Sequence, residues 1–178
     1  MKEIAFYTHA NNKTGFGHLA RCVNLSKILL SANKTLKIYF IGSFSKNIKD
    51  WISSQLNVKF AVPEKKYIVI YDRMDDIENP ENINVNLIKK MQKKSDHLIF
   101  LANGKKLIKR KIFVNTTVIG YKIGKELSKK PNIFWDLKYA PVNNKKINIK
   151  SKDSVLVALG GNNGNDNMDK VLKALSRC

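Results

Sequence analysis

Cysteine is nearly missing from this chain of 178 residues, and long apolar runs are missing altogether. The two cysteines, Cys22 and Cys178, belong to no CxxC motif or cysteine–histidine cluster, which argues against a disulfide framework or a zinc site. No apolar run approaches the roughly 18 residues of a membrane helix. The residues after Met1 look like a strand and not like an export signal. We therefore expect a cytoplasmic protein without a membrane span.

Acidic residues are also scarce: 14 aspartates and glutamates face 33 lysines and arginines, for a formal net charge of +19. A cationic surface favours nucleic acid because binding releases counterions from phosphates. However, the excess is nearly all lysine, and the lysines are spread along the chain. Arginine suits a nucleic-acid surface better, because its planar guanidinium makes paired hydrogen bonds to bases and phosphates. A general compositional bias explains this charge more simply than a nucleic-acid surface does. An anionic small molecule is compatible with either explanation.

Short apolar runs alternate with helix-like segments, which predicts a parallel α/β sheet covered on both faces, of the Rossmann-like kind. The expected strands are Glu3–Thr8, Leu36–Gly42, Tyr67–Tyr71, His97–Ala102 and Ile112–Val114, with a weaker one at Val58–Ala61. The expected helices are His18–Ser31, Ser45–Leu56 and Asn84–Lys94. In the first helix, one face collects the residues expected to pack on the sheet, namely Leu19, Cys22, Val23, Ser26, Leu29 and Leu30.

The most informative stretch is Gly15-Phe16-Gly17-His18, which stands between the first strand and the first helix. Open α/β sheets bind ligands at such junctions. Gly15 and Gly17 can adopt a positive φ and leave room for a ligand against the backbone. The start of the helix offers free N–H groups, and His18 adds a side chain that exchanges protons near neutral pH. This combination predicts a catalytic loop.

The pattern decays between Lys125 and Lys152, where prolines, asparagines and lysines indicate a connector. A new strand, Ser154–Leu159, then runs into the loop Gly160-Gly161-Asn162-Asn163-Gly164 and a helix from Asp166 to Leu175. We expect a first domain over residues 1–140, a linker over 141–152 and the start of a second domain over 153–178. The alternative is that this last unit joins the first sheet.

Several segments, in order, resemble one family. Gly15-x-Gly17-His18-x-x-Arg21-Cys22-x-x-Leu25 resembles the start of the UDP-sugar hydrolases of pseudaminic acid biosynthesis, which are related to spore-coat polysaccharide proteins and to MurG-type GT-B glycosyltransferases. Weaker similarities follow at a strand that ends in Asp72, at Phe113-Val114-Asn115, at Lys138-Tyr139-Ala140-Pro141 and at Leu159-Gly160-Gly161.

The resemblance implies the N-terminal domain of a two-domain GT-B fold, with the sugar and a catalytic histidine on this side. It also implies that the C-terminal domain, most of which lies outside this sequence, holds most of the nucleotide and is needed for the full site. The implied reaction is hydrolysis of a UDP-activated amino-deoxy sugar at its anomeric carbon. The implied partner is this nucleotide sugar, with no cofactor and no metal.

His18 is the predicted general base for this reaction, since a neutral imidazole can take a proton from water. Arg21 lies one helical turn on, where it can bind the sugar or phosphate or fix an acid that orients His18. Asp72, at the end of a strand, can orient His18 or bind a hydroxyl. Tyr139 is a candidate substrate contact. The diphosphate is expected on Gly160, Gly161 and Asn162, in a loop that lacks the Gly-Lys-Ser/Thr of a Walker sequence.

Each of these residues also has a structural interpretation. His18 can cap a helix or pack in the core, Arg21 can form a solvated salt bridge, and Asp72 can cap a turn. For the whole chain, three further functions stay open at this point: a GT-B glycosyltransferase that uses a UDP-sugar donor, a cationic module that binds nucleic acid or another polyanion, and an inactive fragment.

Overall fold

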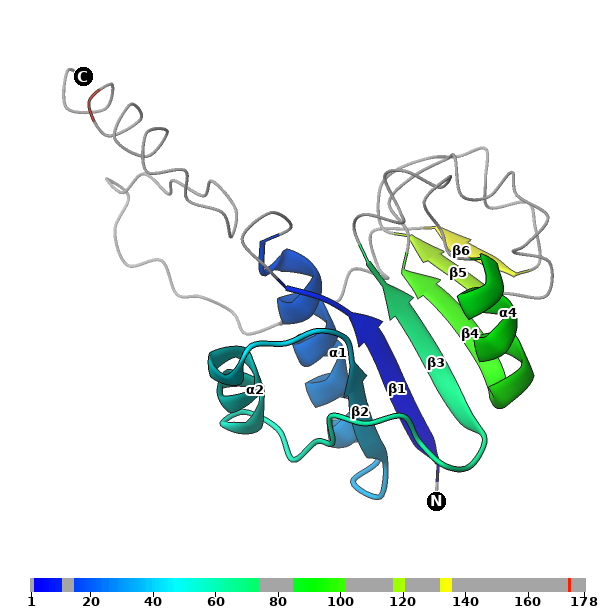
Figure 1. The fold of residues 1–178 in the computed structure, drawn as a ribbon, viewed down its shortest axis with the longest axis horizontal. Helices are drawn as coiled ribbons and strands as arrows, with labels where there is room; N and C mark the ends of the chain where they lie inside the picture. The colour runs from blue at the N-terminus through cyan, green and yellow to red at the C-terminus, as the bar shows by residue number, and fades with distance from the viewer. Residues whose placement is uncertain are drawn as a thin grey trace.

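Six parallel strands form one sheet in the order β2-β1-β3-β4-β5-β6. The structure, a computed structural model, describes residues 2–10, 15–73, 85–101, 117–120, 132–135 and 173. The strands are β1 (Glu3–Thr8), β2 (Lys37–Ile41), β3 (Tyr67–Asp72), β4 (Ser95–Leu101), β5 (Thr117–Gly120) and β6 (Ile133–Trp135). The helices are α1 (Gly17–Ala32), α2 (Lys46–Ser53) and α4 (Val85–Lys94). Figure 1 shows the helices packed on the sheet.

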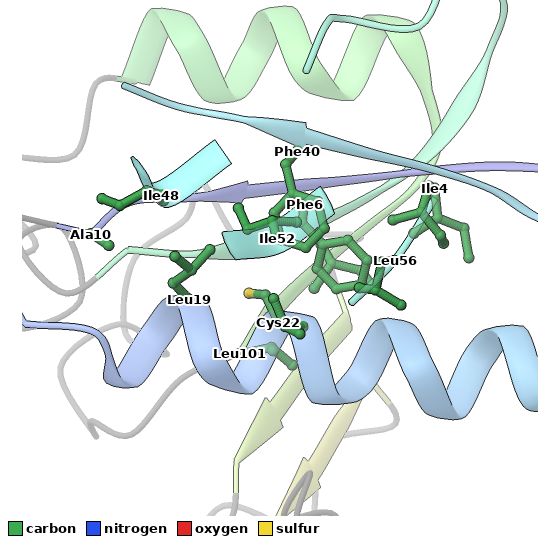
Figure 2. Close-up of a cluster of buried hydrophobic side chains, with 13 residues drawn as sticks. Ile4, Phe6, Ala10, Leu19, Cys22, Phe40, Ile48, Ile52, Leu56 and Leu101 are labelled. Atoms are coloured by element: carbon green, nitrogen blue, oxygen red, sulfur yellow. The ribbon is translucent and has the colours of Figure 1, made fainter. Parts of the chain in front are cut away.

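Alternate residues of the strands face two separate hydrophobic clusters, because successive side chains of a strand point to opposite faces. Phe6 and Phe40 lie in the cluster that α1 and α2 cover with Leu19, Cys22 and Ile52 (Figure 2). The opposite face of the sheet holds the second cluster, to which α4 contributes its two buried residues. This second cluster consists of Ala5, Tyr39, Tyr67, Val69, Tyr71, Ile88, Met91, Leu98, Phe100 and Ile133. The sheet is therefore the middle layer of three.

The order in which the chain adds strands to the sheet changes direction at β1. From β1 it moves outward to β2, and it then returns to the other side of β1 to form β3 and β4. Lys59 extends the outer edge through a parallel bridge to Tyr39, with hydrogen bonds from Phe40 N to Lys59 O at 2.8 Å and from Lys59 N to Ile38 O at 3.0 Å. With this short outer segment included, the strand order follows the Rossmann pattern, whose ligand crevice lies at the reversal point.

The predicted α/β class with a Rossmann-like parallel sheet is confirmed. The weak strand at Val58–Ala61 is reduced to the single bridge at Lys59. The connector expected from Lys125 onward was wrong at Ile133–Trp135, which pairs with β5 as the edge strand β6. The expected strand Ile112–Val114, the linker and the second glycine-loop unit lie outside the described residues. In the described part of the chain, no helix has the length and apolar character to cross a membrane.

Candidate functional site

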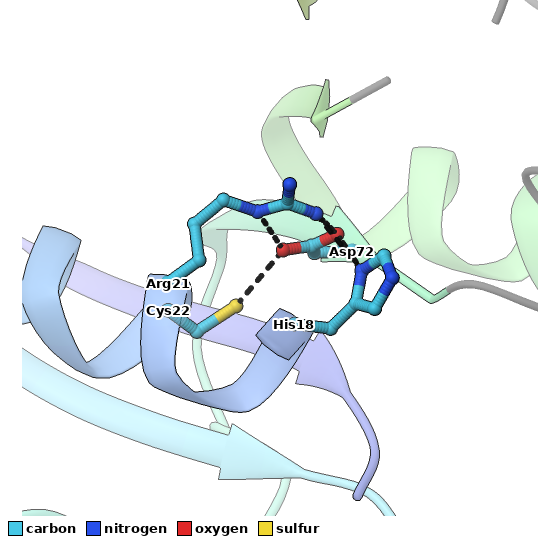
Figure 3. A network of polar contacts seen from close by, with 4 residues as sticks. All are labelled: His18, Arg21, Cys22 and Asp72. Carbon is cyan, nitrogen blue, oxygen red and sulfur yellow. Dashed lines mark hydrogen bonds and ion pairs between the residues drawn. The ribbon is translucent and has the colours of Figure 1, made fainter. Parts of the chain in front are cut away.

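The ends of β1 and β3 meet at the point where the strand order reverses. Thr8, the last residue of β1, pairs in register with Asp72, the last residue of β3. Both side chains are fully buried. The α1 helix starts beside them, so its first turn stands over the carboxyl edge of the two strands (Figure 3). This is the edge at which doubly wound sheets bind their ligands.

The loop that leads into α1 depends on one glycine more than on the other. Gly15 has a φ of 67°, in the left-handed region that side chains rarely adopt, as predicted. Gly17 differs from the prediction of a positive φ, because it is already the first residue of the helix. Among the described residues, apart from its chain neighbours and the backbone of its own helix, a Cβ atom added to Gly17 would meet no atom within 4 Å. Packing within the described part of the chain therefore does not require the second glycine.

The first two turns of α1 have two functions, because residues three and four apart share a face. Leu19, Cys22 and Val23 are buried against the sheet. His18 and Arg21 stand beside this packed face, with side chains 15% and 11% exposed. The packing of the helix on the sheet therefore sets where these two polar side chains project.

A single carboxylate joins the polar side chains of the site (Figure 3). Nδ1 of His18 lies 2.7 Å from Oδ1 of Asp72, and Nε of Arg21 donates to Oδ2 of Asp72 at 2.7 Å. Nη2 of Arg21 donates to Oδ1 of Asp72 and lies 2.8 Å from Nδ1 of His18. The thiol of Cys22 approaches Oδ2 of Asp72 at 3.5 Å. Asp72 thus binds Arg21 in a two-pronged geometry and holds His18 at the same time.

Asp72 is ionised in this arrangement. Burial alone would raise the pKa of its carboxyl, but the hydrogen bonds from His18 and Arg21 and the charge of Arg21 outweigh burial and lower the pKa below its usual value. Cys22 is affected in the opposite sense, because burial and the negative charge of Asp72 raise the pKa of its thiol well above the usual value. Cys22 therefore stays a neutral thiol and is no nucleophile here.

Two groups contact Nδ1 of neutral His18 and act on its proton in opposite senses: Oδ1 of Asp72 at 2.7 Å favours a proton there, and the donor Nη2 of Arg21 at 2.8 Å favours a lone pair. A lone pair on Nδ1 would face the negative Oδ1 of Asp72 at 2.7 Å and be repelled. A proton on Nδ1 instead makes a charge-assisted hydrogen bond. Nε2, which lies on the side of the ring away from Asp72 in Figure 3, then keeps its lone pair. With its proton on Nδ1, neutral His18 can accept a second proton at Nε2.

Three further features lie near the site and are not among its predicted residues. His9 is buried, and its ring lies nearly parallel to that of His18, with centroids 6.1 Å apart and planes 14° apart. Cys22 packs as predicted and also approaches Asp72. At Gly42 an added Cβ would lie 2.1 Å from the carbonyl oxygen of Thr8. The close approach of two strand ends, which no local pattern reports, explains this glycine.

Of the predicted site residues, His18, Arg21 and Asp72 come together, and Gly15 and Gly17 flank them. Tyr139, Gly160, Gly161 and Asn162 lie outside the described residues. Among the described residues, no three histidine, cysteine or acidic side chains are grouped to hold a metal ion. A hollow of about 470 Å³ lies at the opposite, amino edge of the strands, between Lys2, Lys66 and His97. It is far from the Asp72 network.

Comparison with known proteins adds no assignment to this geometry. The chain matches no protein-family model, no curated protein and no solved structure.

Proposed function

We propose that the protein hydrolyses a UDP-activated amino-deoxy sugar at its anomeric carbon and releases UDP, as a step in the synthesis of a surface polysaccharide or of pseudaminic acid. The observation that carries this proposal is the contact of His18 Nδ1 with the buried carboxylate of Asp72, at the carboxyl edge where β1 and β3 end. A second support is the resemblance of the Gly15-x-Gly17-His18-x-x-Arg21 segment to hydrolases of this kind.

In this reaction Nε2 of His18 takes a proton from a water molecule. The water oxygen forms a bond to the anomeric carbon as the bond from that carbon to the diphosphate oxygen breaks. The electron pair leaves with UDP, a good leaving group, so that no strong general acid is needed. General-base assistance of this kind accelerates reactions by roughly 10²–10⁴. The products are a free sugar, UDP and a protonated His18, which later returns its proton to solvent.

Asp72 and Arg21 act as positioning residues for this base. Asp72 favours a proton on Nδ1 and stabilises the imidazolium that forms, since its negative charge lies 2.7 Å from Nδ1. Arg21 balances the charge of Asp72 and holds the carboxylate in one orientation through two donors. After proton transfer the three side chains carry a net charge of +1. This charge favours binding of the anionic diphosphate at the moment when its negative charge increases.

The test is the replacement of His18 by asparagine in the complete protein, with a panel of UDP-sugars as substrates. We expect kcat to fall by at least about 10², with little change in UDP affinity, because only the base is removed. His97→Asn is the matched control, since His97 is exposed near the amino end of β4, away from this site. Equal turnover in the His18 and His97 variants would rule out the proposed base.

The same assay separates hydrolysis from glycosyl transfer, which uses the same base and leaving group with a sugar hydroxyl in place of water. Release of free sugar and UDP without any acceptor supports the hydrolase. Release of UDP only when an acceptor sugar is added supports a glycosyltransferase and contradicts the proposal. No release of UDP under either condition contradicts both.

A further inference from the structure

A second imidazole ring lies beside the ring of the proposed base. His9 directly follows Thr8, the last residue of β1, and its side chain is buried. Its ring is stacked with that of His18, with centroids 6.1 Å apart and planes that differ by 14°. This separation is within the range over which flat rings interact in an offset stack. The reaction described above uses His18 alone, so the buried ring of His9 has no part in it.

The backbone on both sides of His9 is fixed by packing. Thr8 is fully buried and pairs in register with Asp72 of β3. Ala10 is buried in the hydrophobic cluster that also contains Leu19 of α1. A buried side chain on a backbone that is held in this way has little room to change its rotamer. The ring of His9 is therefore a fixed surface against which another ring can rest.

The polar contacts of His18 hold one atom of its ring and not the whole plane. Asp72 and Arg21 both contact Nδ1, at 2.7 and 2.8 Å. Because both contacts are made at one nitrogen, small changes in the two side-chain torsions can tilt the ring while Nδ1 stays in place. The torsion next to an imidazole ring has only a broad preference, so it does little to oppose such a tilt. A tilt moves Nε2, which lies on the side of the ring away from Asp72 (Figure 3).

We propose that His9 is a positioning residue for His18, which is an inference that rests on the function proposed above. The nearly parallel ring of His9 restricts the tilt of His18, because tilting would bring the edge of one ring into the other. Asp72 and Arg21 then hold Nδ1, and His9 holds the plane of the ring. The direction of Nε2 toward the attacking water is fixed by the three contacts together. A displacement of about 1 Å at a reacting group can reduce a rate by about 10².

The first experiment compares His9→Ala with His9→Phe in the complete protein, with UDP-N-acetylglucosamine as the substrate. Alanine removes the stacked ring, and phenylalanine keeps a flat ring but has no nitrogen. We expect kcat to fall by about 10- to 100-fold in His9→Ala while KM changes less than about twofold, because the substrate does not touch His9. In His9→Phe we expect kcat to return to within about fivefold of the wild type.

Leu56→Ala is the control for a general loss of packing. Leu56 is buried in the hydrophobic cluster under α1 and α2, so its truncation should lower the temperature of unfolding and leave kcat unchanged. An equal loss of kcat in Leu56→Ala and His9→Ala would contradict a positioning role. Equal losses in His9→Phe and His9→Ala would show that a nitrogen of His9 is required, and would overturn the inference in favour of a proton carrier.

Nuclear magnetic resonance tests the contact between the rings without any need for turnover. The chain has three histidines, His9, His18 and His97, so the ring C–H signals are few, and those of His18 are identified by their loss in His18→Asn. A stacked ring displaces the signals of its neighbour through its ring current. We expect the His18 signals to shift in His9→Ala and to stay in place in His97→Asn. His9→Leu, which fills more of the same space without a ring current, should give the shift seen with alanine. Unchanged His18 signals in both ring-free variants would rule out the contact.

The two proposals fail in distinguishable ways. A shift of the His18 signals in His9→Ala, in a protein whose wild-type form releases no UDP, would support the contact of the rings and reject hydrolysis. Measurable hydrolysis with an unchanged kcat in His9→Ala would keep the enzyme and reject the role of His9.

Discussion

Asp72 is the residue on which the local electrostatics of the site depend. Its side chain is fully buried, and it accepts hydrogen bonds from Arg21 and His18. An ionised carboxylate in this position is stabilised only as long as its cationic partner is present. The same contacts that orient His18 therefore also contribute to folding, so that a change at Asp72 affects both stability and chemistry.

Acid should remove this contribution over a defined range of pH. The pKa of Asp72 is lowered in the folded protein from a usual value of 3.8, so the unfolded state binds the proton more readily. The stabilisation is complete above that value and is lost as the pH falls toward and through the folded pKa. We expect Asp72→Asn to lower the free energy of unfolding near pH 7 by about 3–5 kcal/mol, because Arg21 is left without its buried partner.

Urea unfolding of both proteins between about pH 7 and pH 2 measures this effect. The difference in stability between the wild type and Asp72→Asn should narrow at the acid end. Asp50→Asn makes the same chemical change at an exposed position of α2, and it should shift stability by no more than about 0.5 kcal/mol. A constant difference across the whole range would show that the charge of Asp72 is not the cause.

At the scale of elements, the site results from the junction of three of them: the ends of β1 and β3 and the first turns of α1. The two glycines at this junction differ in what their substitution should do. An added methyl at Gly42 would overlap the Thr8 carbonyl oxygen of β1, whereas one at Gly17 would meet none of the described side chains or neighbouring elements within 4 Å. One glycine is required by the packing of the strands, and the other is free of that requirement.

We therefore expect opposite results from two alanine variants. Gly42→Ala should reduce the free energy of unfolding by about 1–3 kcal/mol, because the strand ends must move apart. Gly17→Ala should leave stability unchanged or raise it by up to about 1 kcal/mol, because alanine favours the helix. If the substrate lies beside Gly17, Gly17→Ala should nevertheless raise KM. Thermal unfolding and steady-state kinetics on the same preparations check both statements.

The elements themselves were largely predictable, because apolar periodicity carries most of the information. The prediction placed β1 at its observed bounds and α1 and β3 within one residue of theirs. The strands β5 and β6 were missed because segments of three or four residues show too few alternations, and Pro131 precedes β6 in a lysine-rich stretch. Strands of this length form because a neighbouring strand is already in place.

The candidate site was predictable as a set of residues and not as a geometry. The positions of Arg21 and Asp72 at a helix start and a strand end mark them as candidates. Their separation of 51 positions in the sequence leaves open which atoms meet. The contacts that act on Nδ1 of His18, with Asp72 at 2.7 Å and with Arg21 at 2.8 Å, are visible only in the structure. The approach of Cys22 to the same carboxylate could not be predicted, because a helix face pattern describes it only as a packing residue.

At the scale of the molecule, the charge of the described residues is dispersed over both faces of the sheet. In the described part of the chain, exposed lysines occur on α2 at Lys46 and Lys49, on α4 at Lys89 and Lys90, and at the amino edge at Lys66. The helices α2 and α4 belong to opposite faces of the sheet. A nucleic-acid surface normally concentrates its charge on one face or along one groove.

We therefore expect only weak binding to an arbitrary polyanion such as heparin or single-stranded DNA, with a Kd of about 10⁻⁵ M or weaker at physiological salt. His18→Ala should leave this binding unchanged, because it depends on distributed lysines. Filter binding over a series of salt concentrations measures both quantities. Nanomolar, steeply salt-dependent binding would favour the polyanion-binding module over the enzyme.

The double role of the first turns of α1 has a consequence for redesign. Reactive groups on an exposed loop are readily moved to a new scaffold by exchanging that loop. Here the packing of Leu19, Cys22 and Val23 in the hydrophobic core sets the directions in which His18 and Arg21 project. To transfer this site to another scaffold, α1 must be moved together with β1 and β3. The smallest transferable unit is therefore these three elements as they pack in this domain.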